Sequence, residues 1–299
     1  MGSYVEMRNN LADVIRVSFV TLSLILVTLF LLNIDTLHNP IDLLKNFFIG
    51  YERTRNAIGF MHPNASGNTA LAAIMISAFY NCKNTKMRTR VLVYLADVIF
   101  MYVILESASR TSLIAVMIFV LIRAYIFILM KIKGTFPRIM LTIILGLTSL
   151  LLLDLSMDIF LLTNRAGNFY YNIPILKSNN ALWTGLAYIG SGEFMSTSYG
   201  TFFVDNYLLY TLMSTGILGL IFNIIFMISL SIKVFKIANN SSSMYKTVAL
   251  ILIVNIIMSM TETCFMYPSF SSSYIFTVLY LSVFAKKTTK RRKNVNYCE

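Results

Sequence analysis

Arginines in three separate polar stretches are the side chains best suited to chemistry in this sequence. Arg55, with Arg53 just before it, opens RNAIGFMHPN, Arg110 lies in ESASRTS, and Arg165 lies in LLTNRAGNFY. A guanidinium group presents a planar fork of donors that matches a phosphate group, so each stretch is a candidate anion site. Hydroxyl donors around Arg110 would extend such a site, from Ser107, Ser109, Thr111 and Ser112.

Two of these arginines also have structural interpretations. Arg110 could be an arginine at a membrane boundary that pairs with Glu106 one helical turn earlier. Arg165 could be a solvated charge on a loop, although its apolar neighbours favour a loop that lies back on the membrane.

Four side chains are candidates for proton transfer: Glu193, Asp205, Glu262 and His62. Asp205 could instead cap the helix that follows it, and Glu262 could form a buried pair. His62, next to a proline at a predicted helix start, could instead have a structural role, in which it packs a polar part of the chain against the membrane interface. The second histidine, His38, has no supporting context in the sequence. The residue types alone do not rank the four candidates.

The motifs of metal- and nucleotide-dependent chemistry are absent from the sequence. There is no Walker A loop, no D-x-D pair and no G-x-S-x-G elbow. The two histidines lack carboxylates at metal-binding spacing, and the three cysteines are far apart. We therefore expect no metal and no cofactor, and a substrate that needs arginines instead.

The elements that must position these residues are transmembrane helices. Hydrophobic residues make up 57% of the 299 residues, charged residues only 13%, and the mean hydropathy is +0.70. The expected fold class is an all-α polytopic membrane protein that forms a single integral membrane domain. About eight spans are predicted, at 14–32, 65–81, 91–108, 111–130, 138–153, 206–231, 246–264 and 271–285.

The charge distribution predicts the orientation. The tail Lys286–Lys293 (KKTTKRRK) is strongly basic, which favours a cytoplasmic C-terminus and, after an even number of spans, a cytoplasmic N-terminus. The net charge of +12 then comes mainly from basic residues in short inner loops. We therefore expect no nucleic-acid partner. The long segments 33–64 and 154–205 face outward, between five N-terminal spans (14–153) and three C-terminal spans (206–285), with 286–299 as the basic tail. The candidate arginines therefore lie on the outer face.

The order of the outer motifs resembles the O-antigen polymerase and ligase superfamily. RNAIGFMHPN is followed by SASRTS, NRAGNFYYNIPIL, GLAYIGSGEF and VDNYLLYTLMSTGILG, over roughly residues 50–264. The pattern is most similar to the Wzy-type polymerases of capsular and exopolysaccharide loci. Relatives are usually longer, with about four more spans before the first motif, so this chain is expected to be N-terminally short.

The resemblance implies an inverting, metal-independent glycosyltransferase in the plasma membrane of a bacterium. Its substrate would be an oligosaccharide repeat unit linked to polyprenyl (undecaprenyl) diphosphate, and a flippase and a chain-length regulator would be its partners. On the family's pattern, Arg55, Arg110 and Arg165 hold the diphosphate, together with Arg53.

Three alternatives stay open at this point. The ligase branch of the superfamily expects a histidine in the large outer loop, and the absence of one between Asp154 and Asp205 favours a polymerase. A flippase or transporter would place ionisable residues at mid-membrane, where only Asp97 and Arg123 are expected. A non-catalytic scaffold would not need the set of outer arginines.

Overall fold

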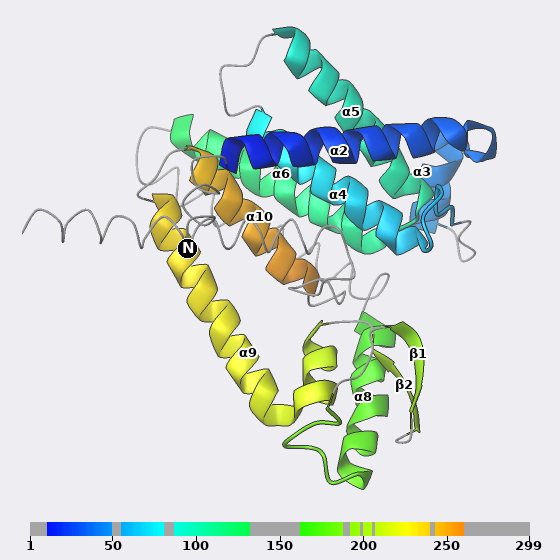
Figure 1. Ribbon diagram of the computed structural model, residues 1–299, viewed down its shortest axis with the longest axis vertical. Helices are drawn as coiled ribbons and strands as arrows, with labels where there is room; N and C mark the ends of the chain where they lie inside the picture. The colour runs from blue at the N-terminus through cyan, green and yellow to red at the C-terminus, as the bar shows by residue number, and fades with distance from the viewer. Residues whose placement is uncertain are drawn as a thin grey trace, which may run out of the picture. The chain divides into compact units, whose positions relative to one another are not determined.

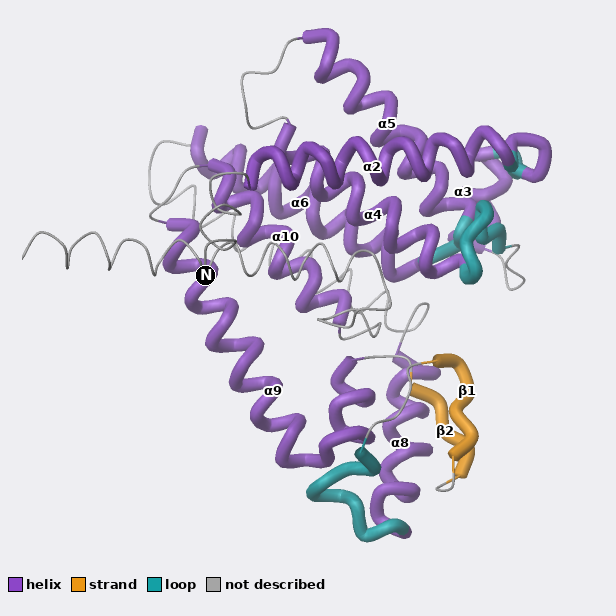
Figure 2. The backbone as a smooth tube through the Cα atoms, viewed as in Figure 1, coloured by secondary structure: helices purple, strands orange, loops and turns teal. Residues whose placement is uncertain are grey.

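The computed structural model describes residues 11–49, 55–80, 87–131, 162–187, 192–197, 200–204, 207–239 and 243–259. These residues are mainly helical, with one antiparallel hairpin (Figures 1 and 2). The elements are α2 (Leu11–Leu32), η1 (Ile34–Thr36), α3 (Pro40–Ile49), α4 (Pro63–Tyr80), α5 (Met87–Glu106), α6 (Arg110–Lys131), α8 (Leu162–Ser178), β1 (Gly192–Thr197), β2 (Gly200–Val204), α9 (Tyr207–Asn239) and α10 (Ser243–Ser259).

Two of the described helices are long and apolar enough to cross a membrane, over Ile15–Leu32 in α2 and Tyr207–Lys233 in α9. A shorter apolar helix covers Thr247–Ser259. Helices occupy six of the predicted spans, as α2, α4, α5, α6, α9 and α10. The predicted spans 138–153 and 271–285 lie outside the described residues, and the total of eight spans stays a prediction.

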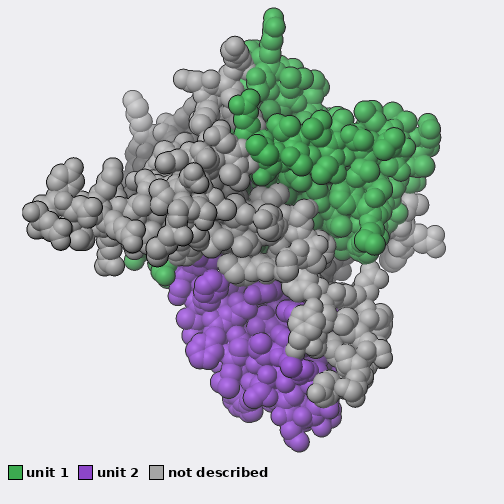
Figure 3. All heavy atoms as spheres, viewed as in Figure 1, with its two compact units in different colours: residues 1–117, 231–255, 266–299 green, residues 118–230, 256–265 purple. Residues whose placement is uncertain are grey.

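The chain divides into two compact units (Figure 3). Unit 1 comprises Met1–Met117, Ser231–Asn255 and Met266–Glu299, and unit 2 comprises Ile118–Leu230 and Ile256–Phe265. Each unit is described by itself below.

Helix α4 is the centre of unit 1. All its residues from Ser66 to Phe79 are buried, and it packs against α5 and α2. Many of these residues are small, which lets neighbouring helices approach closely. By contrast, α2 buries one stripe, formed by Ile15, Phe19, Leu22 and Leu26, and exposes apolar side chains on its other face. An apolar exposed face is typical of a helix that contacts lipid.

In unit 2, α8, β2 and the first part of α9 share an apolar core. Helix α9 is not one continuous helix, because Gly216 has φ 68° and ψ −169°. Asn223 Nδ2 donates to Tyr207 Oη at 2.9 Å and lies 3.0 Å from Thr211 Oγ1, so the chain folds back after Gly216 (Figure 1). A straight helix would separate residues 207 and 223 by about 24 Å. The predicted span 206–231 is therefore helical, but its helix is interrupted at Gly216.

Two backbone hydrogen bonds between residues 182–186 and 213–217 hold the break in α9, and we call this pair of bonds the strap. Leu186 N–H donates to the Met213 carbonyl at 2.8 Å, and Ile217 N–H donates to the Leu182 carbonyl at 2.9 Å. The strap requires close backbone contact: a Cβ on Gly216 would lie 2.3 Å from the carbonyl carbon of Trp183. Residues 182–186 and 213–217, which are distant in sequence, are thus joined through their backbones.

Candidate functional site

The connection between α2 and α3 holds His38 in a well-bonded turn. Asn33 Nδ2 donates to the Leu29 carbonyl at 2.8 Å, and Thr36 Oγ1 donates to the Asn33 carbonyl at 2.8 Å. At the start of α3, Asn39 Oδ1 accepts the Ile41 N–H at 3.0 Å. Side chains on both sides of His38 therefore satisfy the backbone groups that helix ends leave unpaired.

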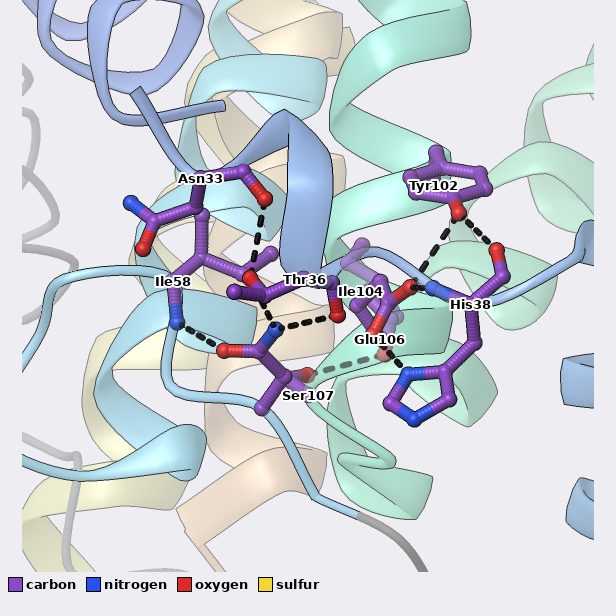
Figure 4. Close-up of polar contacts among 9 residues, drawn as sticks. Asn33, Thr36, His38, Ile58, Tyr102, Ile104, Glu106 and Ser107 are labelled. Atoms are coloured by element: carbon purple, nitrogen blue, oxygen red, sulfur yellow. Dashed lines mark hydrogen bonds and ion pairs between the residues drawn. The ribbon is translucent and has the colours of Figure 1, made fainter. Parts of the chain in front are cut away.

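Glu106, the last residue of α5, is fully buried and binds His38 at two points (Figure 4). Its Oε1 accepts the His38 backbone N–H at 2.5 Å, and its Oε2 lies 3.0 Å from His38 Nδ1. The Tyr102 hydroxyl lies within hydrogen-bonding distance of the His38 carbonyl and 3.1 Å from Glu106 Oε1. An edge-on contact with Phe30 of α2, with ring centroids 5.6 Å apart, positions Tyr102. Sequence reasoning missed this contact, which joins residues 68 positions apart.

The segment that carries Arg55 joins the same cluster. The Asn56 N–H donates to the Glu106 carbonyl at 3.0 Å, and its side-chain Nδ2 lies 3.3 Å from Thr36 Oγ1. Asn56 Oδ1 also accepts the Ile58 N–H at 2.9 Å, which closes a local turn. Three segments, 33–39, 55–62 and 106–110, therefore meet at one end of unit 1.

Arg55 and Arg110 lie within electrostatic reach of one another in this cluster. Burial lowers the pKa of the Arg110 guanidinium, and the positive charge of Arg55 lowers it further. Arg55 is exposed and Arg110 is half-buried. Two neighbouring guanidinium groups together present positive charge and N–H donors that match the oxygens of a phosphate group. The arrangement is therefore suited to binding a phosphate or diphosphate.

The alternative in which Arg110 pairs with Glu106 along one helical turn does not fit the helix boundaries. Helix α5 ends at Glu106, α6 begins at Arg110, and Ala108 between them has φ 46°. Because the helix is interrupted, the spacing of four residues does not bring the two side chains onto one helical face. Among the described residues, the basic side chain that the Glu106 carboxylate contacts is His38, with 3.0 Å between Oε2 and Nδ1.

The serines around Arg110 are also not the anion donors that the sequence suggested. Ser107 Oγ donates to the Ile104 carbonyl at 2.8 Å, Ser109 Oγ lies 2.8 Å from Ser112 Oγ, and Ser112 Oγ donates to Asn68 Oδ1 at 2.9 Å. All three are buried. Helix α4 causes this burial, because its Gly67 lies directly against the corner between α5 and α6. Thr111 is buried as well.

His62 caps helix α4. Its Nδ1 accepts the Asn64 N–H at 3.1 Å, and its carbonyl accepts the Ala65 N–H at 3.0 Å. In the neutral ring, an Nδ1 that accepts a hydrogen bond leaves the hydrogen on Nε2. His62 therefore has a structural role at the start of α4, which fits its neighbour Pro63 at the first helical position.

The other predicted site residues belong to unit 2 or lie outside the described residues. Arg165 lies in α8 and Glu193 in β1, and neither side chain is described. Arg53, Asp205 and Glu262 lie outside the described residues. The close approach expected for a ligand at GLAYIG is made at Gly185 by the chain itself, because a Cβ there would lie 2.3 Å from the Ser214 backbone.

Within the part of the chain that the structure describes, no group of three His, Cys, Asp or Glu residues could hold a metal ion. No protein-family model, no curated protein and no solved structure matches this chain.

Proposed function

We propose that this chain is a metal-independent glycosyltransferase that polymerises polyprenyl-diphosphate-linked repeat units into a surface polysaccharide. It would act at the outer face of a bacterial plasma membrane, with a lipid-linked oligosaccharide as donor. The observation that carries this proposal is the meeting of two segments predicted to face outward: Asn56, next to Arg55, donates its N–H to the carbonyl of Glu106, at the corner that leads to Arg110. The charge of Arg55 lowers the pKa of Arg110, in agreement with this contact. The order of the outer motifs supports it from the sequence side.

The arginine pair suits the chemistry of this reaction. When a sugar is transferred from a polyprenyl diphosphate, the bond from C1 to the diphosphate oxygen breaks and negative charge builds on the leaving group. Guanidinium groups that are already in place stabilise that charge most in the transition state, where it is largest. Negative charge on the diphosphate would interact favourably with both guanidinium groups.

A second observation concerns the alternative of a transporter. Asp97, one of two charges expected at mid-membrane, accepts a hydrogen bond of 2.9 Å from Ser77 of α4. This contact supports a structural role for Asp97 between α4 and α5. A transporter would need such a group to bind cargo or protons.

The proposal is tested by reconstitution into proteoliposomes with a synthetic polyprenyl-diphosphate repeat unit. Products are separated by chain length on a gel. We expect products longer than one unit for the wild type, and a rate reduced about 10²–10³-fold in Arg55→Gln and Arg110→Gln. Arg88→Gln is the matched control, since it removes the same charge from an exposed position at the opposite end of α5.

Two results would overturn the proposal. Movement of the lipid-linked sugar across the bilayer without a new glycosidic bond would make the protein a transporter. Polymer made at the wild-type rate by both arginine variants would remove the arginine pair from the reaction.

A further inference from the structure

We propose that His38 is the general base that activates the acceptor hydroxyl, and that buried Glu106 orients it. This inference rests on the proposed function and assigns the base for that reaction. The assignment differs from the four candidates that the sequence suggested.

The first support is the two-point hold on the imidazole. Glu106 binds the His38 backbone N–H with one carboxylate oxygen and approaches ring Nδ1 with the other. Such a grip fixes both the position of the residue and the rotation of its ring. The carboxylate is fully buried while the His38 side chain is 44% exposed. Figure 4 shows the second ring nitrogen directed away from Glu106.

The second support is the tautomer that this contact imposes. An ionised carboxylate can only accept hydrogen bonds, so Nδ1 must carry the hydrogen of the neutral ring. The lone pair then lies on Nε2, on the exposed side. A carboxylate that holds a histidine in this way also stabilises the imidazolium that forms after proton transfer.

The hydrogen bonds of the two histidines favour opposite neutral tautomers. Nδ1 of His62 accepts the Asn64 N–H, so the ring hydrogen lies on Nε2 and no lone pair is left for a substrate. His38 presents the reverse arrangement. The α2–α3 turn itself is already held by Asn33, Thr36 and Asn39, so the ring contact with Glu106 is not required to form it.

The third support is the shared location of base and arginines. Glu106 binds His38 through its side chain and Asn56, the neighbour of Arg55, through its carbonyl. Arg110 follows Glu106 after the corner of residues 107–109. Base and anion-binding groups are therefore built on the same three segments.

The reaction step can be written from these groups. His38 Nε2 takes the proton of the acceptor hydroxyl while that oxygen forms a bond to C1 of the donor sugar. The bond from C1 to the diphosphate oxygen breaks, and its electron pair stays on the diphosphate, next to Arg55 and Arg110. The imidazolium then returns its proton to water. Attack opposite the leaving group inverts the configuration at C1.

The test compares His38→Asn with His62→Asn in the polymerisation assay, and measures donor binding and melting temperature in parallel. Asn at position 38 can still donate to Glu106, and Asn at position 62 is a good helix cap. We expect His38→Asn to bind donor as the wild type does and to lose about 10²–10⁴-fold in turnover. We expect His62→Asn to stay within threefold of the wild type. Added imidazole should restore part of the turnover of His38→Gly.

Glu106→Gln tests the role of Glu106 as a positioning residue. The amide oxygen can keep the His38 N–H, but the amide nitrogen then donates to Nδ1, which places the ring hydrogen on Nε2. We expect turnover to fall with KM for the donor unchanged, although shape and packing are preserved. If His38→Asn does not fold, Glu106→Gln alone tests whether His38 is the base.

The outcomes separate the two proposals. If the wild type makes no polymer, the proposed function fails. If the wild type polymerises and His38→Asn or Glu106→Gln does so at a similar rate, the base assignment fails and the polymerase stands. Loss of donor binding in His38→Asn, without rescue of His38→Gly by imidazole, would make the contact structural.

Discussion

A single methyl group on Gly67 should displace the corner that carries Glu106 and Arg110. A Cβ at position 67 would lie 2.6 Å from Ser109 Cβ and 2.7 Å from Ser107 Oγ. To reach an ordinary contact of 3.4 Å, α4 and the corner must separate by roughly 0.8 Å. Overpacking of this kind costs about 1–3 kcal/mol, and weakening the bond from Ser112 to Asn68 adds about 1 kcal/mol.

These terms total about 2–4 kcal/mol, and the higher helix propensity of Ala offsets about 1 kcal/mol, so Gly67→Ala should lower the free energy of unfolding by about 1–3 kcal/mol. It should also reduce turnover about 10²-fold, because a displacement near 1 Å is enough to misplace a binding group. Melting temperature and polymerisation rate are measured on the same detergent-purified protein. The double variant Gly67→Ala with Ser109→Gly removes the Cβ that makes the closest contact, and should recover part of both losses. A Gly67→Ala protein with wild-type stability and rate would refute the reasoning, as would a double variant no better than the single one.

Two further predictions concern the helix break and the helix cap. Gly216→Ala places a Cβ in a backbone conformation that only glycine adopts readily and removes the close approach of Trp183, so about 3–5 kcal/mol of local stability should be lost. Hydrogen exchange should then accelerate at least 10²-fold in peptides covering 181–187, and unchanged exchange would show that the strap does not depend on this glycine. His62→Ala should lower the free energy of unfolding by about 1 kcal/mol, while His62→Asn stays at the wild-type value because Asn restores the acceptor for Asn64. Equal destabilisation of the two variants in chemical denaturation would contradict the capping role.

Helices α2, α4, α5 and α6 were largely predictable from the sequence because each is a long apolar run. Helices α3 and α8 and the hairpin of β1 and β2 were not, because they lie in the predicted outer segments 33–64 and 154–205. The predicted spans at 14–32, 65–81, 91–108 and 111–130 coincide with α2, α4, α5 and α6 to within a few residues. The break in α9 was not predictable in the same way. In the sequence, Gly216 is one of several glycines in an apolar run. The strap that requires a glycine at this position comes from residues 181–187, which are distant in sequence.

The candidate site was predictable only in part. Arg55 and Arg110 stand out because they are guanidinium groups in polar segments that are predicted to face outward, where few other basic residues lie. The contact between His38 and Glu106 joins residues 68 positions apart and leaves no local pattern in the sequence. The serines near Arg110 were misread because their exposure depends on how closely α4 approaches at Gly67, which is a property of packing and not of composition.

The most direct test of the central claim is the affinity for a polyprenyl diphosphate without sugar, measured for the wild type, Arg55→Gln, Arg110→Gln and Arg88→Gln. A charge-assisted hydrogen bond contributes about 1.5–3 kcal/mol, so each of the first two variants should bind roughly ten- to a hundredfold more weakly than the wild type. Arg88→Gln should bind as the wild type does. Equal affinity in all four proteins would contradict the claim that Arg55 and Arg110 together hold a diphosphate.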